Sequence, residues 1–229
     1  MQCWNSQNPC RRVNRRTLKK AARMPIDLAA LVNPAHTALV LQEVQNGVVG
    51  SPSALPALAQ AAAAVNLVNH CAELAARARD LGIPVFHCTA ETRADRVGAN
   101  RNARLFMGVD KSPVQLVPGS EAVQVPTEIG VDPRDVVLPR HHGLGPMTGT
   151  QLDPMLRHCG VTTIVGVGVS LNIGMFSLVM DAVNLGYQIV VPRDAVAGVP
   201  PEYGQAVIDN ALNLLATIST TEAILAAWQ

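Results

Sequence analysis

The chain has 229 residues, of which 48% are hydrophobic and only 3% are aromatic, and its formal net charge is +1. These values predict one globular domain with a core of Ala, Val, Leu and Ile, and the polar residues that interrupt every apolar stretch exclude a membrane span. Seven basic residues fall within residues 1–24, so the rest of the chain has 11 basic against 17 acidic residues, which excludes a nucleic-acid surface.

Residues 1–24 form a basic leader without an acidic residue. Its charge resembles that of a mitochondrial transit peptide, but it is poor in Ser and contains helix-breaking Pro and Asn, and no apolar region follows it as in a secretory signal. Two interpretations stay open: an over-extended start, with translation beginning at Met24, or a disordered basic arm. We take residues 25–229 as the folded domain.

Short β-branched runs alternate with longer helical patterns from residue 37 onwards, which is typical of a parallel sheet covered by helices. We expect strands at Thr37–Gln42, Ile83–Cys88, Asp135–Leu138, Thr162–Gly168 and Gln188–Pro192, with a short sixth near Ala216–Thr220. The expected helices are Ala54–Leu81, Thr150–His158, Asn172–Leu185, Tyr203–Leu215 and Thr221–Trp228. The predicted fold class is α/β: a single-domain, three-layer α/β/α sandwich with a mainly parallel sheet of about six strands.

The segment 89–134 is long, polar and rich in Arg and Pro, so we expect loops there with at most short helices. In open parallel sheets a ligand lies beyond the carboxyl ends of the strands, near the switch in strand order. The residues in that position are Glu43, Thr89–Glu91, Arg140–His142 and Ser170–Gly174. Three of these four stretches contain ionisable side chains, so this edge of the sheet is the predicted site.

Glu43 and Arg140 each stand at the end of a predicted buried strand. A poorly solvated carboxyl group has a raised pKa and can act as a general acid or base. A guanidinium can hold it ionised or bind a substrate carboxylate with two hydrogen bonds. A surface Glu and an ordinary exposed Arg are the alternatives. His141 and His142 follow, but no third ligand stands at a recognisable spacing, so we interpret them as loop histidines and predict no metal.

The stretch from Gly166 to Gly174 passes from a strand into a helix. Its G-x-G lacks the third glycine of a dinucleotide fingerprint and lies inside the strand, so no nucleotide cofactor is expected. Asn172 is a candidate N-cap. The free N–H groups in the first turn of the helix, around Gly174, can bind an anion or a developing oxyanion.

Four arginines crowd the loop after the second strand: Arg93, Arg96, Arg101 and Arg104. They form either a solvated face or, through one or two members, a pocket for an acidic small molecule. The five cysteines contain no CxxC pair, so neither a zinc site nor a disulfide framework is predicted. We interpret Cys88 and Cys159 as small core or turn residues, and a reducing cytoplasm is the expected location.

Several segments in the same order along the chain resemble the isochorismatase-like hydrolase superfamily, which includes nicotinamidases, N-carbamoylsarcosine amidases and isochorismatases. The resemblance covers residues 35–228 and implies a Rossmann-like fold with a cis peptide bond between Val169 and Ser170. The segments are TALVLQEVQNG (37–47), similar to an aliphatic run followed by D-x-Q-N-D; LPR (138–140) with GTQLD (149–153), similar to a strand-Lys segment and G-T-x-L-D; GVSLNIG (168–174), similar to G-V-x-T-N-x-C; and the pairs Asp181-Ala182, Gly186-Tyr187 and Asp194-Ala195.

The chain departs from this family at each position of the Asp-Lys-Cys triad that its amidases use. Glu43 stands at the Asp position, Arg140 at the Lys position and Gly174 at the Cys position. Arg140 can slip by one residue against His141, because the spacing to Gly149 is about one residue longer than the family pattern. Without a thiolate at this turn, covalent acyl-enzyme chemistry is not available there.

Isochorismatases in the family also have glycine at the Cys position, and they cleave a vinyl ether by acid catalysis. The resemblance therefore implies Glu43 as proton donor, Arg140 as its electrostatic partner, and Ser170 with Gly174 as backbone donors. It also implies a substrate site lined by Glu91, Arg101 and His141. Glu91 stands where isochorismatases have Gln, and Arg101 is the nearest candidate for the Arg that follows that Gln.

Three hypotheses follow from these residues. The first is an acid-catalysed hydrolase of a small carboxylated molecule, without a cofactor. The second is a catalytically inactive family member that serves as a binding or oligomeric scaffold. The third is a thiol-dependent amidase with a displaced cysteine such as Cys88. The expected partners are a small-molecule substrate and, since family members commonly oligomerise, further copies of the chain, which sedimentation at micromolar concentration tests.

Overall fold

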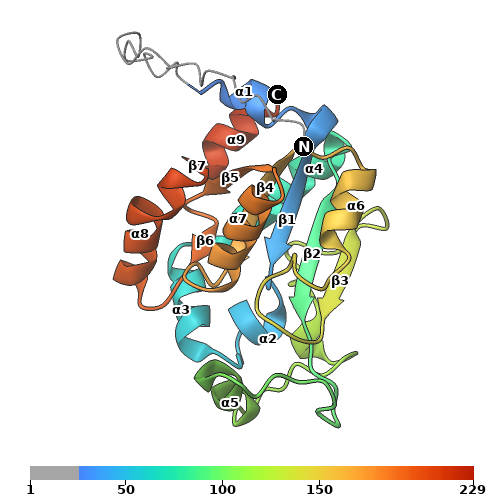
Figure 1. Cartoon of the computed structure of the whole chain (residues 1–229), viewed down its shortest axis with the longest axis vertical. Coiled ribbons are helices and arrows are strands. Elements are labelled where there is room, and N and C mark those ends of the chain that lie inside the picture. Colours follow the sequence, from blue (N-terminus) through green and yellow to red (C-terminus); the bar gives the residue numbers. More distant parts are fainter. Residues whose placement is uncertain (1–25) are drawn as a thin grey trace, which may run out of the picture.

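Seven strands within residues 26–229, the part of the chain that the computed structural model describes, form one parallel sheet (Figure 1). The leader at 1–24 lies outside the described residues. The strands are β1 (Thr37–Gln42), β2 (Val85–Ala90), β3 (Val136–Arg140), β4 (Thr163–Val169), β5 (Gln188–Pro192), β6 (Val196–Ala197) and β7 (Thr217–Ser219). Their order is β3-β2-β1-β4-β5-β7, and β6 pairs with the end of β4. The six predicted strands are present, and β6 was missed because two residues are too few to produce a pattern.

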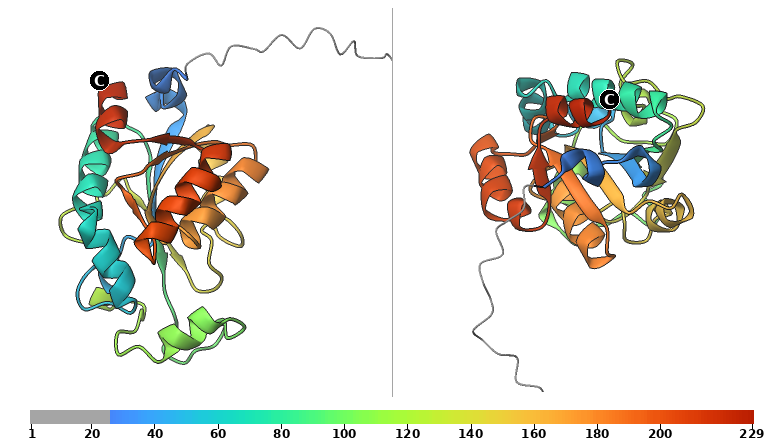
Figure 2. Two further views of the ribbon diagram at one scale, coloured as in Figure 1. Left: turned by 90° about the vertical axis from the view of Figure 1, so that its left-hand side faces the viewer. Right: turned by 90° about the horizontal axis from the view of Figure 1, so that it is seen from above.

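Helices cover both faces of this sheet, which confirms the predicted three-layer α/β architecture (Figure 2). One layer contains α3 (Pro56–Ala64), α4 (Leu67–Asp80) and α9 (Thr221–Ala227), with α1 (Leu28–Leu31) beside α9. The other contains α6 (Leu152–His158), α7 (Gly174–Asn184) and α8 (Pro201–Asn210). The short helices α2 (Asn46–Val49) and α5 (Arg104–Asp110) lie beyond the carboxyl ends of the strands, and the 3₁₀ turns are Pro34–His36, Glu121–Val123 and Leu212–Leu214. No helix in residues 26–229 is both long and apolar enough to cross a membrane.

Two hydrophobic cores lie on the two faces of the sheet. Successive side chains of a strand point to opposite faces, so Leu39 and Leu41 of β1 pack toward α3, α4 and α9, whereas Ala38 and Val40 pack toward α6, α7 and α8. All six residues of β1 are buried, as expected for a central parallel strand. Burial on both faces fixes the register of β1, and therefore the position of the residue that follows it.

The prediction of one continuous helix over Ala54–Leu81 is wrong, because two helices, α3 and α4, occupy this segment. Asn66, which connects α3 to α4, has a φ of 54°. This left-handed conformation ends one helix before the next begins, and Asn tolerates it better than most residues. The Ala-rich pattern gives no sign of the break. The expected Tyr203–Leu215 helix likewise divides into α8 and a 3₁₀ turn. Segment 89–134 begins with the last two residues of β2 and then contains only α5 and one 3₁₀ turn among its loops, as predicted.

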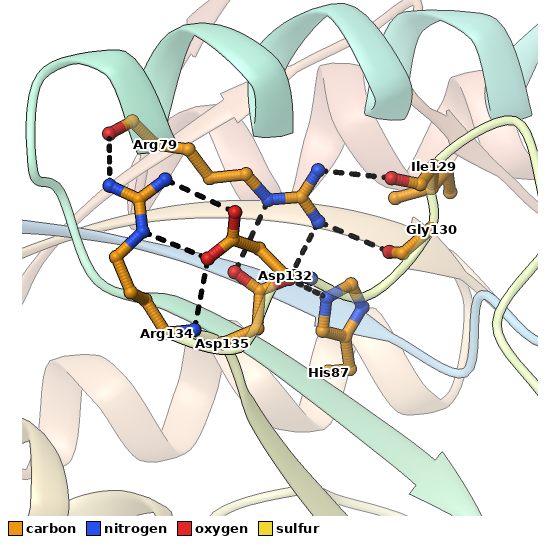
Figure 3. Close-up of polar contacts among 7 residues, drawn as sticks. All are labelled: Arg79, His87, Ile129, Gly130, Asp132, Arg134 and Asp135. Atoms are coloured by element: carbon orange, nitrogen blue, oxygen red, sulfur yellow. Dashed lines mark hydrogen bonds and ion pairs between the residues drawn. The ribbon is translucent and has the colours of Figure 1, made fainter.

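A buried ionic cluster holds the start of the edge strand β3 against α4 (Figure 3). Asp135 accepts hydrogen bonds from Arg79 at 2.6 Å, from His87 Nε2 at 2.9 Å and from the Asp132 N–H at 3.0 Å. The side chains of Asp135 and His87 are each 1% exposed. Burial raises the pKa of Asp135, but the hydrogen bonds from Arg79 and His87 outweigh it and leave the pKa below its ordinary value. Asp135 is therefore an ionised anchor for β3, whose other end carries Arg140.

Candidate functional site

The strand order of the sheet reverses between β1 and β4, which are paired at its centre. Glu43 follows β1, and the turn from Ser170 to Gly174 follows β4. Arg140 is the last residue of β3, and Glu91 follows β2. The fold thus brings these residues to the carboxyl edge of the sheet at its switch point, where ligands bind in open α/β sheets.

Glu43 has an unusual backbone conformation that is fixed by its neighbours. Its φ is 53°, in the left-handed region that non-glycine residues rarely adopt, and its N–H donates to the Cys88 carbonyl at 2.8 Å. Its side chain is 16% exposed and forms an ion pair with Arg140, whose side chain is 8% exposed. Burial raises the pKa of Glu43 more than the Arg140 charge and hydrogen bond lower it. A carboxyl group in this setting can hold and release a proton.

The Arg140 guanidinium links three parts of the site. It donates to Glu43, to the His142 carbonyl at 3.1 Å and to the Gly143 carbonyl. The backbone carbonyl of Arg140 accepts a hydrogen bond from the Glu91 N–H at 2.9 Å. Arg140, and not its neighbour His141, is therefore the residue that faces Glu43, while His141 is exposed. The guanidinium both pairs with the carboxylate and holds the loop that follows β3.

The turn after β4 contains backbone N–H groups that have no backbone acceptor among the described residues. The Val169–Ser170 peptide bond is cis, as the family resemblance implied, and α7 begins at Gly174. The N–H groups of Ser170 and Gly174 donate to no other described backbone group. The expectation that Asn172 caps this helix is wrong: the N-cap is Ile173, and no side chain caps it. Asn172 Nδ2 instead lies 3.5 Å from the Val199 carbonyl.

Two clefts share a wall formed by Glu43, Ala54, Leu55, Leu105 and Leu144. The first, which we call the arginine cleft, has a volume of about 100 Å³ and is lined by Arg140, Arg96, Glu91, Asn100, His141 and His142. The second, the turn cleft, has a volume of about 440 Å³ and is lined by Ser170, Asn172, Gly174 and apolar residues of α3. The turn cleft is within the size range of small-molecule sites, whereas the arginine cleft is smaller. Leu105 of α5 lines both clefts.

Glu43, Arg140, Gly174, Ser170, Glu91 and His141 therefore all line these clefts. Arg101 does not: it is exposed, and Arg96 lines the arginine cleft instead. Arg96 pairs with Asp110 of α5, which a sequence pattern cannot anticipate. Sequence reasoning also missed Gln42, a fully buried amide whose Nε2 donates to Glu43 Oε1 at 3.0 Å. A polar residue that ends an otherwise apolar strand was the available signal.

No cysteine of residues 26–229 lines either cleft. Cys88 points into the core between the sheet and α7, and burial raises the pKa of its thiol to about 12. Cys71 is buried in the opposite core, and Cys159 is exposed at the end of α6. Within the same residues, no group of three or more His, Cys, Asp or Glu side chains is arranged to hold a metal ion. The chemical groups that line the clefts are thus carboxyl groups, guanidinium groups, the imidazoles of His141 and His142, and backbone N–H groups.

Comparison with known proteins agrees with the fold. The Isochorismatase domain family matches residues 37–223. The isochorismatase family protein YecD from Escherichia coli O157:H7 is 32% identical over 197 residues, which cover 86% of this chain and 98% of YecD. An isochorismatase family protein from Burkholderia thailandensis has a similar structure, with a TM-score of 0.70, 29% identity, and coverage of 86% of this chain and 96% of that one. A cysteine hydrolase from Pseudomonas syringae shares the fold, with a TM-score of 0.74 at 20% identity over 86% of this chain and 94% of its own.

Proposed function

We propose, since this chain belongs to the isochorismatase family, that it is a hydrolase in which Glu43 is the general acid and no covalent cysteine intermediate forms. The observation that carries the proposal is the buried Glu43 carboxyl group, whose pKa is raised by burial. It lies on the shared wall of two clefts that no cysteine of residues 26–229 lines. A raised pKa keeps a fraction of Glu43 protonated at a pH where an ordinary carboxyl group is ionised.

In the proposed reaction, the Glu43 proton is transferred to the substrate and leaves a carboxylate that Arg140 stabilises. On an enol ether, the proton adds to the double-bond carbon, and water then attacks the cation that results. A proton of that water returns to Glu43, and the hemiketal breaks into a carbonyl compound and an alcohol. In this proposal the N–H groups of Ser170 and Gly174, two residues that line the turn cleft, donate to a substrate oxygen on which negative charge develops.

An alkylation experiment separates this proposal from its alternatives. We expect the purified chain to hydrolyse a member of a panel of small enol ethers, esters and amides at the same rate before and after treatment with iodoacetamide. Inactivation by iodoacetamide would instead indicate a thiol-dependent amidase that uses a displaced cysteine. Absence of turnover on the whole panel, with probe binding intact, would indicate the inactive scaffold, which the saturation of Arg140 by its three acceptors favours.

The charges of the arginine cleft favour a neutral or cationic substrate over the carboxylated molecule that the sequence suggests. Arg140 is paired with Glu43, and Arg96 is paired with Asp110. Glu91 lines the same cleft and forms no ion pair or side-chain hydrogen bond with another residue of 26–229. The unpaired charge of the cleft is therefore negative, so a bound anion would lie near a carboxylate of the same sign.

Small aromatic probes test this preference without knowledge of the substrate. We expect benzylamine to bind more tightly than benzoate at neutral pH, as measured by NMR titration. Glu91→Gln should weaken benzylamine binding about two- to fivefold, the range of a partly exposed charge pair. Arg101→Gln is the matched control, because Arg101 lies outside both clefts. Tighter binding of benzoate than of benzylamine would contradict the preference.

A further inference from the structure

Gln42 is the last residue of β1 and is fully buried beside the proposed acid. Its Nε2 donates to Glu43 Oε1 at 3.0 Å and lies 3.4 Å from the Leu144 carbonyl. Its Oε1 is buried and has no partner among the described residues. Because a buried amide without its full set of hydrogen bonds is unfavourable, the position of Gln42 calls for an explanation other than stability.

The Gln42 amide lies in the space that a side chain at position 174 would need. A Cβ atom added to Gly174 would lie 2.9 Å from Gln42 Nε2, 3.0 Å from the Val169 carbonyl and 3.4 Å from Gln42 Cγ. The distance to Nε2 is too short for a Cβ atom, so the amide would have to shift. Gln42 is fully buried and its Nε2 is hydrogen-bonded to Glu43, so that shift would disturb the contact with Glu43. The same tight contact between β1 and β4 affects Gly168, where an added Cβ would lie 2.2 Å from the Gln42 carbonyl oxygen.

We infer that Gln42 is a positioning residue for Glu43, and that its amide occupies the place of a side chain at position 174. Gln42 and Gly174 are then a matched pair: the glycine makes room for the amide, and the amide holds the carboxyl group against Arg140. The acid and the missing side chain are thus parts of one arrangement. The inference rests on the proposed function only where it concerns reaction rate.

The side-chain amide of Gln42, through its Nε2–H group, also affects the proton equilibrium of Glu43. A donor that faces a carboxylate stabilises its ionised form and lowers the pKa, so Gln42 acts in the same direction as Arg140 and against burial. Removal of the donor should raise the pKa of Glu43. If Glu43 is the acid, its protonated form then persists to higher pH, and the decline of the rate with rising pH moves upward.

The first experiment measures the titration of Glu43 directly, by carbon NMR of chain labelled at the Glu carboxyl groups, with the Glu43 signal assigned by its loss in Glu43→Gln. We expect Gln42→Met, which keeps the length of the side chain and removes the donor, to titrate at higher pH than the wild type. Gln45→Met is the matched control: Gln45 is equally buried, but it bonds to the backbone of Ala90 and Ala122 and not to Glu43.

An unchanged titration in Gln42→Met would overturn the positioning role. A titration at lower pH would overturn it as well, because it would mean that the amide oxygen faces Glu43 and stabilises the protonated acid. The measurement does not require turnover. If Glu43→Gln were fully active, the proposed function would fail, yet the comparison of Gln42→Met with Gln45→Met would still decide this inference.

The second experiment tests the matched pair through thermal unfolding. Gly174→Ala should lower the midpoint by about 3–10 °C, as overpacking does in a domain of this size. Gly108→Ala in α5 is the control, because nothing lies within 4 Å of the added Cβ there. Addition of Gln42→Ala to Gly174→Ala should cost less than the sum of the two single losses. A Gly174→Ala protein as stable as Gly108→Ala would refute the pairing, even if Gln42→Met does not fold.

Discussion

Glu43→Gln is expected to lower turnover about 10²–10⁴-fold, the usual effect of losing a general acid, while substrate affinity stays close to that of the wild type. Gln has nearly the same volume as Glu, and its amide oxygen can still accept from Arg140, which donates to Glu43 Oε1 in the wild type. What the amide lacks is a transferable proton. Steady-state kinetics on a substrate found in the panel, together with a binding titration, measures the two effects separately.

The pH dependence of the wild-type rate is a further test of Glu43 as the acid. Burial raises the pKa of Glu43 above its ordinary value of 4.5. An acid catalyst works in its protonated form, so kcat/KM should be highest below this raised pKa and should fall as the pH rises through it. Residual activity of Glu43→Gln should lack this decline. Glu73→Gln, on the exposed surface of α4, is the control with the same chemical change. Full activity of Glu43→Gln would place the acid elsewhere.

The position of Glu43 and Arg140 at one edge of the sheet could be predicted because strand ends determine it. Apolar runs define β1 and β3 closely enough to show that Glu43 and Arg140 stand at strand ends. The expectation of a buried strand is wrong for β3, because it is an edge strand and is partly exposed. Parallel strands place all such residues on the same edge. The facts that Glu43 contacts Arg140, and that Ser170 and Gly174 lie nearby, depend on this topology and little on side-chain detail.

The contacts that depend on loops and packing could not be predicted from the sequence. Nothing in the spacing of the loop arginines shows that Arg96 and not Arg101 lines the cleft, because the choice depends on the path of the loop and on Asp110 of α5. The break at Asn66 depends on a single backbone angle inside an Ala-rich run. Gln42 is the last residue of β1, and only its distances to Glu43 and Gly174 show that it also belongs to the site.

Asp135→Ala is expected to have the largest effect on stability, a loss of about 3–5 kcal/mol in the free energy of unfolding, as when one partner of a buried ion pair is removed. Asp135 accepts from Arg79, from His87 and from the Asp132 N–H, and its side chain is 1% exposed. Its loss leaves the Arg79 guanidinium, which is 15% exposed, without its counter-charge. Arg79 keeps its bonds to the carbonyls of Ile129 and Gly130, which favours the lower end of the range.

Urea unfolding at several pH values measures this loss and its origin. The pKa of Asp135 is lowered in the folded state, so its contribution is present above the ordinary Asp pKa and is lost as the pH falls through the folded value. Asp135→Ala should therefore lose less stability than the wild type over that acid range. Arg134→Ala is the control: it removes the ion pair between Arg134 and Asp132, whose side chains are 64% and 28% exposed, and should change stability little.

Asp135→Ala should also affect the candidate site through β3. β3 is an edge strand that pairs only with β2 in the described sheet, and the Asp135 cluster holds its beginning while Arg140 forms its end. A looser β3 should let Arg140 move away from Glu43, so Asp135→Ala should reduce activity even at temperatures where the protein stays folded. An Asp135→Ala protein as stable as Arg134→Ala would mean that desolvation of the cluster cancels its hydrogen bonds, and that β3 is held by its pairing with β2 alone.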